Sequence, residues 1–274
     1  MQTERNTTLP LNNMTANDLS RPPLCRNNLS VDLLASDGLE VTNYIRKRLG
    51  HEKIIISGSS WGSFLATKMA HSAPNKYHFY VGLSQIVNGR KLYTESYKKV
   101  KSIAIEKNDQ ATLNILNSIG PPFWSQPASF GKLRRTIKKY EDESVSQLAD
   151  WKMANEYLSE QTKRAYIFGE EFSFLKYIGL NGDGMVHNIA LDKCCNQFKI
   201  PIYIIQGQKD LLTVPRVTRE YFKKIKAPVK EYIPLEHSAH DQTIEMLQAY
   251  LDTLNAGVSR FIEKAILPAP KTSN

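Results

Sequence analysis

The chain has 274 residues, of which 41% are hydrophobic and 23% charged, with 14 glycines and 13 prolines. This globular composition excludes collagen-like, low-complexity and wholly disordered proteins. No apolar run approaches the roughly 20 residues of a membrane-spanning helix, and the first 30 residues contain no apolar segment typical of a secretory signal. The three cysteines, Cys25, Cys194 and Cys195, cannot all pair within the chain and show no spacing typical of a zinc site. With no secretory signal either, we expect a reduced, cytoplasmic protein.

The net charge is strongly positive, +9 from 36 basic and 27 acidic residues. Such a charge could serve nucleic acid or an acidic surface. Apolar residues stand between the charges of one basic cluster, at Leu133, Ile137 and Tyr140, so we favour amphipathic helices with solvated charged faces. No signature of a nucleic-acid-binding module accompanies the charge. We therefore expect neither nucleic acid nor a membrane as a partner.

Alternating strands and helices are predicted along most of the chain, after a polar, loop-like segment at 1–28. Short, β-branched or apolar runs predict strands at 53–57, 79–87, 201–206 and 230–234. Helical spacing of apolar residues predicts helices at 31–49, 63–73, 217–225 and 241–254. This alternation predicts an α/β fold with a mostly parallel sheet. Residues 90–190 have mostly helical patterning and form an insertion between the two halves.

A possible nucleophile lies directly after the first predicted strand. Gly58, Ser60 and Gly62 fit the pattern Gly-x-Ser-x-Gly, which in this context predicts a sharp turn that exposes a serine between a strand and a helix. Small residues two before and two after the serine let the backbone turn without a clash. The backbone N–H of Trp61 would then face a developing oxyanion. A purely structural Gly/Ser turn is the less favoured alternative.

A serine nucleophile needs a base and an orienting acid, in the chain order serine, acid, histidine for this architecture. Asp210 follows the strand at 201–206, at the carboxyl end where α/β sheets assemble their sites. A turn or helix-capping aspartate is the alternative for this position. Two histidines, His237 and His240, lie in the loop after the last predicted strand, and either could be the base.

Together these segments resemble the α/β-hydrolase superfamily, and within it the proline-iminopeptidase-like serine hydrolases. The matching segments are 58–63, 207–215, 226–230 and 236–240, and the resemblance extends over about 29–264. It implies Ser60 as nucleophile, Asp210 as orienting carboxylate and His240, rather than His237, as the base. It also implies catalysis without a metal or other cofactor, on a small-molecule or short peptide substrate.

The resemblance implies two structural parts. An α/β-hydrolase core would consist of residues 1–89 and 196–274, and residues 90–195 would form a helical cap over the site. Iminopeptidases bind the free amine of their substrate with cap glutamates, a role that Glu170 and Glu171 could fill. We favour instead two solvent-facing glutamates, because paired carboxylates are usually exposed.

The chain departs from the family's pattern before the nucleophile. Family members carry three or four strands there, with a His-Gly-Gly loop that supplies a second oxyanion N–H, whereas here 57 residues precede Gly58 and no His-Gly-Gly occurs. We therefore expect an N-terminally truncated α/β-hydrolase fold with an exposed apolar edge at 53–57. The predicted function is a serine hydrolase, foremost an aminopeptidase of the proline-iminopeptidase type. A carboxylic-ester hydrolase, or a catalytically impaired binding protein, is the alternative.

Overall fold

The computed structural model describes residues 29–144, 155 and 158–263. Within them, four parallel strands form one sheet in the order β1-β2-β3-β4. The strands are β1 (Ile54–Ser59), β2 (Tyr77–Leu83), β3 (Ile202–Gly207) and β4 (Lys230–Leu235). All four predicted strands are present, although β2 ends at Leu83, four residues before the predicted end. The predicted N-terminal loop and Cys25 lie outside the described residues.

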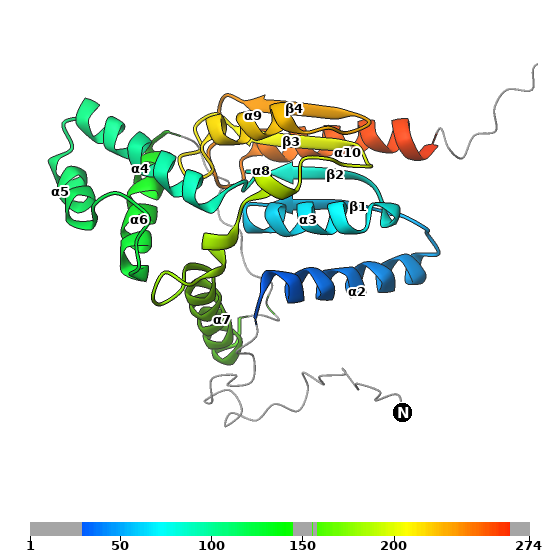
Figure 1. Ribbon diagram of the computed structural model, residues 1–274, viewed down its shortest axis with the longest axis horizontal. Helices are drawn as coiled ribbons and strands as arrows, with labels where there is room; N and C mark the ends of the chain where they lie inside the picture. The colour runs from blue at the N-terminus through cyan, green and yellow to red at the C-terminus, as the bar shows by residue number, and fades with distance from the viewer. Residues whose placement is uncertain (1–28, 145–154, 156–157, 264–274) are drawn as a thin grey trace, which may run out of the picture.

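Helices surround the sheet on both faces and at one end (Figure 1). The longer helices are α2 (Val31–Leu49), α3 (Trp61–Ser72), α4 (Gly89–Glu106), α5 (Gln110–Ile119), α6 (Pro127–Ser144), α7 (Glu160–Ile178), α9 (Pro215–Lys224) and α10 (Ile244–Val258). The short ones are η2 (Pro74–Lys76), η4 (Met185–Asn188), α8 (Leu191–Cys194) and the π-helical turn η5 (Ser259–Glu263). Among all described helices, none has the length and apolar character that a membrane crossing needs.

The two central strands, β2 and β3, are buried on both faces, as their unalternating apolar sequences predict, whereas the edge strands β1 and β4 are partly exposed. Tyr80 and Ile204 belong to a core cluster that includes side chains of α3 and α9. Their neighbours along the strands, Phe79 and Tyr203, belong to a second cluster with Met246 of α10. Because successive side chains of a strand point to opposite faces, this division shows that α10 covers one face and α3 and α9 the other.

Helix α2 packs against α3 through a close contact at a glycine. The Ser30 side chain caps its start by accepting from the Leu33 N–H, and Gly50, at φ 69°, ends it in the left-handed region. A Cβ atom at Gly38 would lie 2.7 Å from Met69 Sδ of α3. Gly38 therefore weakens the isolated helix but leaves room for the end of the Met69 side chain of α3.

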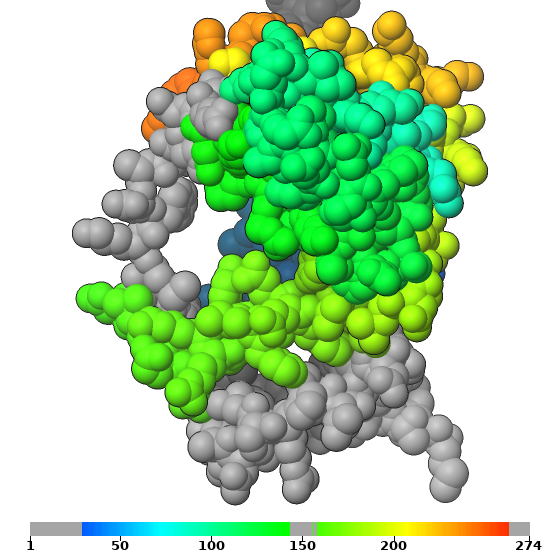
Figure 2. All heavy atoms as spheres, turned by 90° about the vertical axis from the view of Figure 1, so that its left-hand side faces the viewer, coloured from blue at the N-terminus to red at the C-terminus, as the bar shows by residue number. Residues whose placement is uncertain are grey.

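Helices α4, α5 and α6 gather beyond the carboxyl ends of the strands (Figure 1). Their shared core contains aromatic side chains in edge-to-face contact, with the ring centroids of Tyr93 and Phe130 4.8 Å apart and those of Trp124 and Phe130 5.0 Å apart. Figure 2 shows these helices on one side of a hollow, with α7 on the other side. The division into a core of 1–89 and 196–274 and a cap of 90–195 stays a prediction.

Candidate active site

The turn that carries Ser60 is sharp and strained. Ser60 lies between Ser59, the last residue of β1, and Trp61, the first residue of α3, and its backbone angles are φ 51° and ψ −120°. A positive φ is uncommon outside glycine and marks a conformation that its surroundings must enforce. The backbone folds back so closely that a Cβ atom at Gly58 would lie 2.2 Å from the carbonyl oxygen of Gly62. At Gly62 itself a Cβ atom would meet nothing within 4 Å, so only the first glycine of the pattern is sterically required.

Hydrogen bonds fix this turn to the end of the neighbouring strand. The Ser60 N–H donates to the carbonyl oxygen of Leu83, the last residue of β2, at 3.0 Å. The buried hydroxyl of Ser63 donates to the Ser60 carbonyl at 2.5 Å and accepts from the Ile86 N–H at 3.0 Å. The strained conformation is thus held by the end of β2, the segment after it and a buried hydroxyl of α3.

Three residues predicted from the sequence lie within hydrogen-bonding distance of one another. His240 Nε2 is 2.9 Å from Ser60 Oγ. On the other side of the ring, His240 Nδ1 is 3.1 Å from Asp210 Oδ2 and 3.3 Å from Asp210 Oδ1. Asp210 and His240 are buried, and Ser60 is partly exposed. One imidazole therefore connects a hydroxyl to a buried carboxylate.

The loop after β3 holds Asp210 as an anion. Its Oδ1 accepts from the backbone N–H groups of Leu212, at 2.9 Å, and Thr213, at 2.6 Å. Its Oδ2 accepts from the Gln206 side chain at 3.0 Å and from the Thr213 hydroxyl. Burial acts to raise the pKa of Asp210, but the charge of His240 and the hydrogen bonds from His240 and Thr213 hold this pKa below its ordinary value.

His240 and Asp210 shift each other's pKa in opposite directions. Burial acts to lower the pKa of His240, but the charge of Asp210 and the hydrogen bond to it raise this pKa above its ordinary value. An imidazolium formed by taking a proton from Ser60 would therefore be stabilised at this position.

The alternative base and the predicted amine-binding glutamates have different surroundings. His237 is exposed, and its backbone N–H donates to Glu245 Oε2 at 3.0 Å. Glu170 and Glu171 are exposed on α7. Trp61 begins α3, and its ring packs against Phe64 and Tyr177, with centroids 5.3 and 5.1 Å away.

Sequence reasoning missed a second buried carboxylate beside the site, Glu141 of α6. It is 4% exposed, and its Oε1 accepts from the Leu211 N–H at 2.7 Å, one residue after Asp210. Burial, and next the charge of Asp210, raise the pKa of Glu141 to about 7. The sequence around Glu141 reads as an amphipathic helix with solvated charges, so no local signal marks this residue as buried.

The chain is similar to known proteins over most of its length. No protein-family model matches it. It is 23% identical over 239 residues to the probable aminopeptidase YbaC of Bacillus subtilis strain 168, covering 85% of this chain and 73% of that protein.

Two solved structures are also similar to this chain over most of its length. The crystal structure of VinJ matches with a TM-score of 0.55 and 13% identity, over 85% of this chain and 73% of VinJ. The proline iminopeptidase of Mycobacterium smegmatis matches with a TM-score of 0.54 and 12% identity, over 86% of this chain and 74% of that enzyme. The predicted fold class is confirmed, and the predicted lack of leading strands stays a prediction. The chain has the α/β-hydrolase fold, and it resembles hydrolases of that fold in both sequence and structure.

Proposed function

We propose that the chain is a serine hydrolase that acts through an acyl-enzyme intermediate. The observation that carries the proposal is the hydrogen-bonded series from Ser60 through His240 to the buried carboxylate of Asp210. Nucleophile, base and orienting acid in this arrangement are the requirement for acyl transfer by serine.

Each step uses a group of this chain. Ser60 Oγ attacks a carbonyl carbon while His240 Nε2 takes the hydroxyl proton, and Asp210 fixes the tautomer of the ring and stabilises the imidazolium. The backbone N–H of Trp61, which follows the nucleophile, donates to the oxyanion. The imidazolium then gives its proton to the leaving group, and water, deprotonated by the same nitrogen, releases the acyl group from Ser60.

An N-terminal aminopeptidase of the proline-iminopeptidase type is the proposed activity. It is supported by the names of the Bacillus relative, a probable aminopeptidase, and of the Mycobacterium structure, a proline iminopeptidase. A carboxylic-ester hydrolase would use the same three residues with a different acyl donor. The substrate on this proposal is a small molecule or short peptide.

A fluorophosphonate probe tests the mechanism, because it reacts with activated serines. The intact chain should be labelled at Ser60, and labelling should be lost in Ser60→Ala and His240→Ala. His237→Ala is the matched control, with a histidine removed from the same loop, and it should label like the wild type. No labelling of the folded wild-type chain, or equal loss in His237→Ala, would contradict the proposal.

Chromogenic substrates then separate the two activities. Hydrolysis of proline p-nitroanilide by the wild type, lost in Ser60→Ala, would support the aminopeptidase. Hydrolysis of p-nitrophenyl butyrate with no release from any aminoacyl anilide would favour the ester hydrolase.

A further inference from the structure

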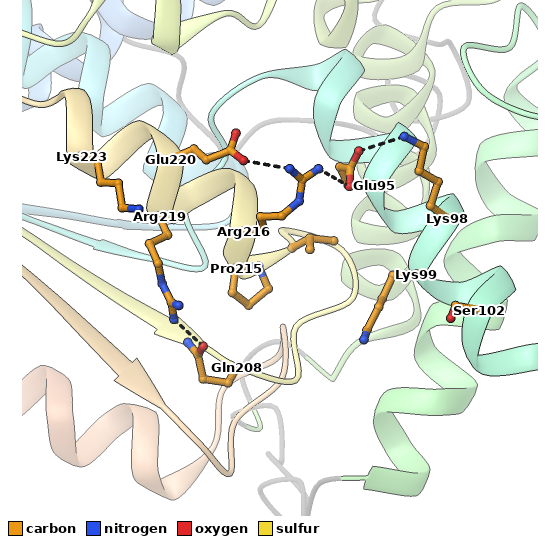
Figure 3. Close-up of a pocket in the computed structure, with 11 residues that line it drawn as sticks. Glu95, Lys98, Lys99, Ser102, Gln208, Pro215, Arg216, Arg219, Glu220 and Lys223 are labelled. Carbon is orange, nitrogen blue, oxygen red and sulfur yellow. Dashed lines mark hydrogen bonds and ion pairs between the residues drawn. The ribbon is translucent and has the colours of Figure 1, made fainter. Parts of the chain in front are cut away.

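A cavity lies beside the loop that carries Asp210. It has a volume of about 600 Å³ and lies between α4 and α9 (Figure 3). Gln208, Val214 and Pro215, which flank the segment 210–213, contribute to its wall, whereas Ser60 and His240 do not. The cavity is therefore separate from the candidate active site but shares one loop with it.

The wall of this cavity is strongly basic. Five cationic side chains line it: Lys98, Lys99, Arg216, Arg219 and Lys223. Against them stand two carboxylates, those of Glu95 and Glu220, which leaves a net charge of +3. This is a concentrated part of the chain's overall positive charge, which the candidate active site does not use.

Both carboxylates are already engaged by the same arginine. Arg216 pairs with Glu95 at 2.5 Å and with Glu220 at 2.8 Å, while Lys98 pairs with Glu95 at 3.3 Å. Figure 3 shows Arg216 between the two acids. The local negative charge thus offsets Arg216 and Lys98 and leaves the other cations without an acidic partner on the wall.

The remaining cations come from two helices. Arg219 of α9 donates to the neutral Gln208 side chain at 2.8 Å, so its charge is not compensated there. In the part of the chain that the structure describes, Lys99 of α4 and Lys223 of α9 have no ion pair. In Figure 3, Lys99 and Arg219 extend on either side of Pro215.

We propose that this cavity is a binding site for a small soluble polyanion with at least two phosphate groups. Lys99 and Arg219, from helices on opposite walls, would each take one anionic group. A guanidinium forms paired hydrogen bonds to phosphate, and an ammonium acts as a point charge. The volume suits a ligand of nucleotide size. Because the cations lie on both α4 and α9, a ligand with two anionic groups can contact both helices at once.

Occupancy of the cavity would also be felt at the catalytic acid, since the wall and Asp210 belong to one loop. Ser96 Oγ of α4 donates to the Leu212 carbonyl at 2.9 Å, which ties α4 to the same segment. Any such coupling is reciprocal between the two sites. The binding itself does not depend on the proposed hydrolase activity and is tested without it.

Isothermal titration calorimetry of the intact chain with pyrophosphate tests the proposal, with inorganic phosphate and sulfate as comparison ligands at physiological salt. Pyrophosphate should bind in a saturable manner and more tightly than either comparison ion. Lys99→Gln and Arg219→Gln should each weaken it about tenfold or more, the value of one lost charge-assisted hydrogen bond.

Matched controls come from the same two helices. Lys101→Gln on α4 and Lys224→Gln on α9 remove the same charge outside the cavity and should leave pyrophosphate affinity nearly unchanged. Unaltered thermal unfolding and far-ultraviolet circular dichroism would show that all four variants are folded. Absence of saturable pyrophosphate binding, equal weakening in all four variants, or binding only to vesicles of phosphatidylglycerol would overturn the proposal.

Discussion

Two buried carboxylates from different regions meet at the loop after β3, and their pKa values are shifted in opposite directions. Asp210, at the carboxyl end of β3, faces His240, and its pKa is lowered. Glu141, on α6 beyond that end, has its pKa raised to about 7 by burial and, next, by the charge of Asp210. Burial acts to raise both pKa values. At Asp210 the charge of His240 and the hydrogen bonds from His240 and Thr213 overcome burial, whereas at Glu141 the charge of Asp210 adds to it. Burial alone does not identify the ionisation state of a carboxylate.

The largest expected effect comes from removal of the charge that faces His240. Asp210→Asn keeps the shape of the side chain but not its charge, so the imidazole loses its orienting partner. We expect the second-order rate of fluorophosphonate labelling to fall about 10⁴-fold, as for loss of the acid in other serine hydrolases.

Asp241→Asn is the matched control, because it removes an exposed carboxylate next to His240. It should label at close to the wild-type rate. If both variants lost the same fraction of the rate, Asp210 would act through its general charge and not through its contact with His240.

The regions also differ in how much of them the sequence predicts. All four strands, the extent of α2, and Ser60 and Asp210 as site candidates follow from local patterns, because backbone turns at strand ends require particular residues. The local pattern leaves His237 and His240 as equal candidates, and only the family resemblance selects His240. The position of Glu141 follows from the packing of α6 against the loop after β3, which joins residues 70 positions apart. A basic, amphipathic helix gives no local sign of such a contact. The basic cavity could not be predicted from the sequence for the same reason, because its cations come from two separate helices.

Substitution of the glycine before Ser60 is expected to reduce the labelling rate by an intermediate amount. Gly58→Ala places a methyl group 2.2 Å from the Gly62 carbonyl oxygen, so the turn must move. We expect a loss of about 1–3 kcal/mol in the free energy of unfolding and a roughly 100-fold slower labelling rate, the cost of a small misplacement of a reacting group.

Gly62→Ala is the matched change within the same motif. Its Cβ atom meets nothing within 4 Å, and alanine is the better helix former by up to about 1 kcal/mol. Stability should be unchanged or slightly increased, and labelling should be retained. Equal damage from both substitutions would show that the turn needs two glycines for a reason other than this close approach.

Glu141→Gln is expected to have the smallest effect on the reaction but to change how the free energy of unfolding depends on pH. Its carboxyl has a folded-state pKa of about 7 and an ordinary value of 4.5, so the folded state binds more protons than the unfolded state between these values. The contribution of Glu141 to stability is therefore fully present below about pH 4.5 and is lost as pH rises through 7. Chemical denaturation at pH 5 and pH 8 should show the variant gaining up to about 3 kcal/mol relative to wild type at the higher pH, at 1.36 kcal/mol for each pKa unit.

The other titratable groups near Glu141 do not contribute, to first order, to this stability difference between variant and wild type. Asp210, His240 and Asp241 surround Glu141 in both proteins, so their own pH dependence cancels when the variant is compared with wild type at each pH. Asp142→Asn, one residue away and exposed on α6, should show no such pH-dependent gain. A gain for Glu141→Gln that is the same at both pH values would mean that Glu141 is ionised throughout this range. In that case burial and the charge of Asp210 would not raise the pKa of Glu141, and the two carboxylates would not differ in the direction of their pKa shifts.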